Sequence, residues 1–185
     1  MAASSWLLVV PAIVLASSRG NAPPERVQLS IATLHAAALT TSRSAGDSTD
    51  SPFFLVAVIG PRASSTTMVP EGGQQRVRQD EAIGARPLTE LTLASGDSVQ
   101  ILLSVLENAQ WQLSGAHWLG SVSLLLTNEG GSVFWRRLDC VASCKVLSGP
   151  ATTALPATPA PPFAGVVELS GNGGTYHLAL RVSRA

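Results

Sequence analysis

Charged residues are scarce in this chain of 185 residues. They make up 13% of it, with 12 lysine and arginine side chains against 12 aspartate and glutamate side chains, where soluble domains carry about 25% charged residues. Hydrophobic residues reach 45%, which predicts a packed core. The formal net charge is zero, and only Arg136 and Arg137 are adjacent basic residues. Nucleic-acid binders need clustered lysine and arginine, so we expect no nucleic-acid partner.

Long apolar runs are also missing. The apolar, uncharged run near the N-terminus, Trp6–Ala16, has 11 residues, whereas a membrane-spanning helix needs about 20. Its length is typical of a signal-peptide core, and small residues allow cleavage after Ala16 or Ala22. We therefore expect a signal peptide at 1–22 and a secreted or periplasmic protein with no stable membrane insertion after signal removal. The alternative is that this run is a buried element of the domain or an uncleaved anchor.

Cysteine is limited to Cys140 and Cys144. In an oxidising compartment such a pair predicts a disulfide that closes a small loop, as at the tip of a hairpin. Reduced structural thiols and a metal or redox site are the alternatives. The three histidines, His35, His117 and His177, are far apart in sequence and form no ligand spacing with the thiols. We expect no metal and no cofactor.

No segment sustains a helical period for 12 residues, although 34–39 is alanine-rich enough for a turn or two. Alternation of apolar and polar residues at period two, which indicates strands, recurs instead. A continuous apolar run, Phe53–Ile59, is typical of a strand covered on both faces. The other expected strands lie around 27–31, 91–93, 99–105, 122–126, 133–135, 145–147, 166–169 and 176–182.

Glycine-rich turn clusters separate these strands, at 95–97, 128–131 and 171–174, and the last predicts a hairpin. About eight strands with such turns favour an all-β, antiparallel β-sandwich over a closed barrel. We expect a single domain at 23–185. Within it, a polar loop or loose hairpin occupies 62–86, and a proline-rich segment at 148–162 crosses the outside of the domain.

Two Gly-Asp-Ser triplets, at 46–48 and 96–98, match the nucleophile block of one lipase and esterase group, and Asn172 and His177 follow downstream. That chemistry needs an aspartate near the histidine and a strand-to-helix turn under the serine. Neither is present here, and both triplets have the composition of ordinary turns. We therefore expect no catalytic residue.

Two tryptophans, Trp111 and Trp118, fall in the predicted connection 109–119. Aromatic side chains on the loops of a β-sandwich can stack on sugar rings or enter a protein interface. The alternative is that their side chains pack into the end of the hydrophobic core. Trp111 and Trp118 are our candidate binding residues.

Several segments between 27 and 126 resemble the calcium- and phospholipid-binding β-sandwich domains of the protein kinase C type. The segments are VQLSI at 27–31, AAAL at 36–39, DSPFF followed by LVAVIG from Asp50, VQILLSVLE at 99–107 and LGSVSL at 119–124. The resemblance implies a sandwich, with calcium held by carboxylates of two loops.

The calcium ligands of that family are largely missing here. The first loop offers Asp47 and Asp50, the latter one residue out of register, and the second loop offers Glu107 and Asn108. Calcium takes six to eight oxygen ligands, so this set is small.

Taken together, these features predict a secreted, non-catalytic β-sandwich domain that binds or assembles with an unknown protein or glycan partner. A calcium-dependent module using Asp47, Asp50 and Glu107, or a carbohydrate-binding module, is the alternative. A hydrolase using Ser48 or Ser98 is a second alternative.

Overall fold

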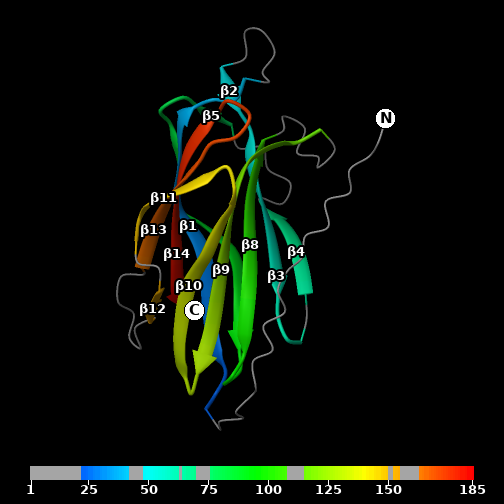
Figure 1. Cartoon of the computed structure of the whole chain (residues 1–185), viewed down its shortest axis with the longest axis vertical. Coiled ribbons are helices and arrows are strands. Elements are labelled where there is room, and N and C mark those ends of the chain that lie inside the picture. Colours follow the sequence, from blue (N-terminus) through cyan, green and yellow to red (C-terminus); the bar gives the residue numbers. More distant parts are fainter. Residues whose placement is uncertain are drawn as a thin grey trace.

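The computed structural model describes residues 22–41, 48–62, 64–69, 76–107, 115–149, 152–154 and 163–185. In these ranges the chain forms fourteen β-strands, all paired antiparallel (Figure 1). The same ranges contain no helix, and therefore none that is long and apolar enough to cross a membrane. The predicted all-β, antiparallel sandwich is confirmed. The predicted signal peptide at 1–22 lies almost wholly outside the described residues.

The strands form two six-stranded sheets and one short pair. Sheet I has the order β11-β13-β14-β1-β6, with β7 also paired to β1, and sheet II has the order β12-β10-β9-β8-β3-β4. The sheet I strands are β1 (Glu25–Ala38), β6 (Ala82–Ile83), β7 (Arg86–Leu93), β11 (Cys144–Ser148), β13 (Phe163–Leu169) and β14 (Thr175–Arg184). The sheet II strands are β3 (Pro52–Ile59), β4 (Ser64–Val69), β8 (Ser98–Glu107), β9 (His117–Glu129), β10 (Ser132–Ala142) and β12 (Thr152–Ala154). The separate pair is β2 (Thr49–Asp50) with β5 (Val77–Arg78).

The core lies between the sheets and follows the alternation that the sequence predicted. Alternate residues of each strand point to the same face, so one face of each sheet is apolar. Leu29 and Leu178 come from sheet I and Ile101 and Leu124 from sheet II, and all four are buried in one hydrophobic cluster. Burial of such side chains is the main favourable contribution to folding.

Two local expectations differ from the structure. The alanine-rich segment 34–39 is not helical, because residues up to Ala38 belong to β1, which pairs with β14 on one side and with β6 and β7 on the other. Pairing with two neighbours overrides the helical propensity of alanine. The described part of the predicted polar loop or loose hairpin at 62–86 contains β4, β5 and β6, because the edges of β3, β2 and β1 supply partners for these strands.

The proline-rich segment 148–162 is described only in part. Its residues Thr152–Ala154 form β12, which pairs with β10 at the edge of sheet II. The preceding strand β11 and the following strand β13 both belong to sheet I. The chain thus passes from sheet I to sheet II and back within this segment.

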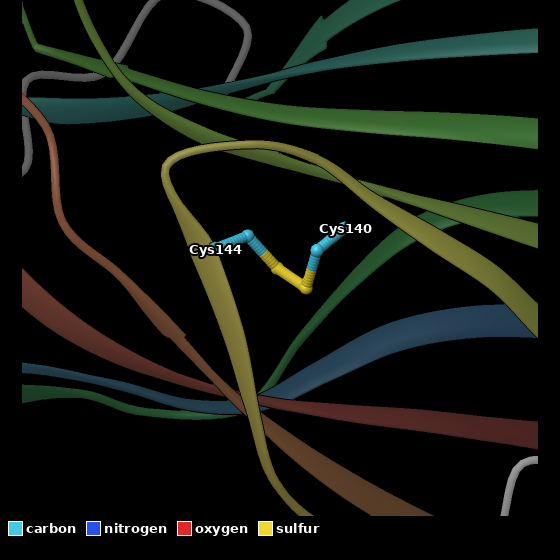
Figure 2. The surroundings of a disulfide bond; sticks show 2 residues. All are labelled: Cys140 and Cys144. Carbon is cyan, nitrogen blue, oxygen red and sulfur yellow. A yellow bond between two sulfur atoms is a disulfide. The ribbon is translucent and has the colours of Figure 1, made fainter.

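The chain also changes sheets between β10 and β11, at the residue Ser143, whose φ is 46°. Cys140 and Cys144 form a disulfide across this bend, with Cα atoms 5.1 Å apart (Figure 2). The predicted disulfide is confirmed, but it fastens a crossing between the two sheets rather than the tip of a hairpin.

Backbone atoms of the two sheets meet beside this bend. A Cβ atom on Gly120 of β9 would lie 2.8 Å from the carbonyl oxygen of Ser143 and 2.9 Å from Cδ2 of Leu169. A Cβ atom on Gly171, in the turn after β13, would meet backbone atoms of Trp118 and lie 2.8 Å from the carbonyl oxygen of Leu119. Both positions therefore need glycine for close approach rather than for an unusual φ.

Replacing Gly171 by alanine should lower the free energy of unfolding by about 1–3 kcal/mol, the usual cost of overpacking. The strain arises because backbone atoms on β9 cannot move aside as a flexible side chain could. Gly84→Ala is the matched control, since nothing lies within 4 Å of a Cβ atom there. Urea titrations of both variants measure the difference, and equal stabilities would contradict the packing described.

Candidate functional site

One end of the sandwich, which we call the corner end, gathers the sheet crossing, the disulfide and several turns. It is formed where β1, β8, β10 and β13 end and where β3, β9 and β14 begin. The short pair β2–β5 lies at the same end, at the top of Figure 1. The sandwich is therefore closed here by side chains and turns that come from both sheets.

A buried carboxylate, that of Asp50, connects three segments of the corner end. Its Oδ2 accepts a hydrogen bond of 2.7 Å from the Thr40 backbone amide, and its Oδ1 accepts one of 3.0 Å from the Thr40 hydroxyl. The hydroxyl of Tyr176 donates to Oδ2 as well. All three residues are fully buried. Buried carboxylates are tolerated only with such donors, so this group fixes the end of β1 against β2 and β14.

The β13–β14 turn docks on the residue that follows Thr40. Asn172 and Gly173 both have positive φ, and Gly174 N–H donates to the Gly171 carbonyl at 2.9 Å, the pattern of a type I′ hairpin turn. The Asn172 carbonyl accepts hydrogen bonds from both the backbone amide and the hydroxyl of Thr41. The predicted hairpin is confirmed, and its turn is held from outside.

An apolar row crosses sheet II at the corner end, on the face away from the core. Phe53 and Leu106 alternate with core residues of β3 and β8, so they point to the outer face. Phe53 is the cross-strand partner of Leu106, which is the partner of Trp118. Phe53 and Leu106 are buried, whereas Trp118 is 44% exposed. The row thus ends in an accessible indole.

Of the two candidate binding residues, the structure describes only Trp118. Trp118 lies in strand β9 rather than in the connection where the sequence placed it, because the strand begins at His117. Trp111 lies outside the described residues. Trp135, by contrast, is buried in the core. Val141, which is 45% exposed, precedes the crossing at Ser143 and adds a second accessible hydrophobic side chain to this end.

Of the candidate calcium ligands, the structure describes Asp50 and Glu107. The oxygens of Asp50 accept hydrogen bonds from Thr40 and Tyr176, so in this arrangement they are occupied. Glu107 is buried at the end of β8, and Asp47 lies outside the described residues. Within the described ranges, no group of three or more His, Cys, Asp and Glu side chains is placed to hold a metal ion.

Ser98 and His177, two residues of the hydrolase alternative, lie in different sheets. Ser98 begins β8 opposite Thr127, at the end of sheet II away from the corner, whereas His177 is on β14 of sheet I. The side chain of Asp97 stabilises the turn that precedes β8, because its Oδ2 accepts a hydrogen bond of 2.9 Å from the Ala94 backbone amide. Ser48 is exposed, and the rest of its triplet is outside the described residues. Ser98 and His177 are therefore not paired in this structure.

A partly buried cation, Arg86, lies at the start of β7. Its Nε atom is buried and makes no hydrogen bond within the described structure. Burial lowers the pKa of its guanidinium from its usual value, because desolvation disfavours the charged form. Its cross-strand partner is the core residue Ile31, so this cation is part of the edge of the core rather than of the corner end.

No protein-family model matches the chain, and comparisons with curated proteins and with solved structures find no match.

Removing the Tyr176 hydroxyl should destabilise the fold, because the Asp50 carboxylate would lose one of its buried donors. Tyr176→Phe should lower the free energy of unfolding by about 1.5–3 kcal/mol, the range for hydrogen bonds to charged groups. A double-mutant cycle with Asp50→Asn tests the contact itself. We expect the double variant to be more stable than the sum of the two single losses predicts, by about 0.5 kcal/mol or more. Additive losses would contradict the interaction.

Proposed function

We propose that this chain is a secreted, non-catalytic β-sandwich domain that binds another macromolecule, a protein or a glycan, through the corner end. The observation that carries the proposal is the apolar row on sheet II, which ends in the exposed indole of Trp118. Tryptophan is enriched among the residues that dominate binding energy, and its face also stacks on sugar rings.

The position of Trp118 supports this role because its backbone is held from the opposite sheet. Gly171 packs against the backbone of Trp118 and Leu119, and the turn that contains Gly171 is fixed to Thr41. Beneath it, Thr40 is bound by Asp50. A preorganised aromatic side chain loses less conformational freedom on binding than one carried by a loose loop.

The disulfide is compatible with an extracellular location, where oxidising conditions preserve such bonds. It closes the sheet crossing next to Val141, so it also fixes the second exposed hydrophobic side chain of this end. Export itself rests on the signal-like N-terminal sequence.

Replacing Trp118 by alanine should abolish partner capture while leaving the fold intact. The immobilised chain is incubated with the extracellular fraction of its own organism, and separately with a panel of insoluble polysaccharides. Because Trp118 is nearly half exposed, its loss should change the free energy of unfolding by only about 1 kcal/mol or less. The double variant with Trp111→Ala extends the test to the second candidate residue.

Ile59→Ala is the matched control. Ile59 lies on the same outer face of sheet II and is 46% exposed, but it is at the end of β3 away from the corner. Binding that survives Trp118→Ala, or that Ile59→Ala weakens equally, would overturn the proposal. Quenching of tryptophan fluorescence by a polysaccharide, lost in Trp118→Ala, identifies a glycan partner, and capture of one protein with no such quenching identifies a protein partner.

A further inference from the structure

Two histidines that are 142 positions apart in sequence are neighbours in sheet I. His35 of β1 is the cross-strand partner of His177 of β14, and Glu168 of β13 is the partner of His177 on its other side. The next residues in this row are Lys145 of β11 and Ala82 of β6. Since Leu34, Ala36, Tyr176 and Leu178 point into the core, the histidines point to the outer face of the sheet.

The two imidazole rings are close enough to share one metal ion. Their ring centroids are 5.8 Å apart, and the ring planes are inclined by 31°. A metal–nitrogen bond of about 2.0–2.1 Å puts the centroids of two imidazoles on one ion roughly 5–6 Å apart. The backbone register therefore already provides the spacing, and side-chain rotation alone would aim the nitrogens at a common point.

Glu168 provides a partner that metal-binding histidines usually have. Its Oε2 lies 3.4 Å from Nε2 of His177. When Nε2–H faces a carboxylate, Nδ1 carries the free lone pair and can bind a metal, as in carboxylate–histidine–metal arrangements. Lys145 is the cross-strand partner of Glu168 on the side away from His177, while the small, exposed Ala82 leaves space beside His35.

We propose that His35 and His177 form a two-nitrogen site for a divalent transition-metal ion, with Glu168 as the positioning residue for His177. Imidazole ligands suit Zn²⁺ and Ni²⁺ rather than Ca²⁺ or Mg²⁺, which prefer oxygen. The protein supplies only two ligands, in keeping with the lack of a three-residue group in the described ranges. The remaining coordination positions stay open to water or to a ligand from a partner.

Isothermal titration of the untagged full chain with Zn²⁺ tests the site. We expect one ion per chain, binding abolished by His35→Gln and His177→Gln, and affinity lowered about 10-fold or more by Glu168→Gln, the usual effect of losing such a partner. His117→Gln is the matched control, because His117 begins β9 in sheet II and should bind no ion. Titration with Mg²⁺ should show no binding to the unmodified chain or to any of these variants.

A measurement on the unmodified chain keeps the proposal testable if a variant fails to fold. Substoichiometric Ni²⁺ is paramagnetic and should broaden the imidazole NMR signals of His35 and His177 but not those of His117. The proposal would be overturned by absence of Zn²⁺ binding in the unmodified chain, by unchanged binding in His177→Gln, or by equal broadening of all three histidines. The two histidines would then be solvated side chains, with His177 beside Glu168.

Discussion

The corner end depends on one buried group, the carboxylate of Asp50. Its oxygens accept hydrogen bonds from the amide and hydroxyl of Thr40 and from the hydroxyl of Tyr176. A buried carboxylate without donors is too costly to persist, so its presence requires that β2 and β14 and the segment after β1 meet here. The next residue, Thr41, donates hydrogen bonds to the β13–β14 turn, and this turn packs against the backbone of Trp118. The position of the exposed indole thus follows from contacts that begin at a buried acid.

The disulfide acts on the other side of the same end. It spans the residue at which the chain leaves sheet II and enters sheet I, and the carbonyl of that residue, Ser143, accepts the Ser170 amide at 2.7 Å. Gly120 lets β9 approach this carbonyl. Two chemically different constraints, a covalent bond and a buried hydrogen-bonded group, therefore hold the corner end together, where Trp118 lies.

Local patterns predicted most of the fold. Period-two alternation located strands such as β8 and β14, and Asn172–Gly173 located the hairpin turn, because these signals depend on neighbouring residues alone. The two cysteines are four positions apart in sequence, which is also a local signal. The alanine-rich end of β1 was missed because pairing with β14 and β6, not propensity, decides its conformation.

The candidate sites depended on long-range register and could not be predicted in the same way. Asp50 resembled a calcium ligand in sequence, since its donor Tyr176 is 126 positions away. Phe53 and Trp118 become parts of one row only through β8 between them. The pairing of Glu168 with His177 could have been found by counting outward from the hairpin turn, but His35 joins them only because β1 lies beside β14.

Amide hydrogen exchange at Thr40 tests most directly whether Asp50 organises the corner end. Thr40 lies beyond β1, and its amide donates to the carboxylate of Asp50 rather than to a strand neighbour. The amide should exchange as slowly as those of the central strands, whose opening requires global unfolding. Exchange as fast as that of an exposed turn amide would show that the corner end opens locally. It would contradict the claim that Asp50 holds the β13–β14 turn and Trp118 in place.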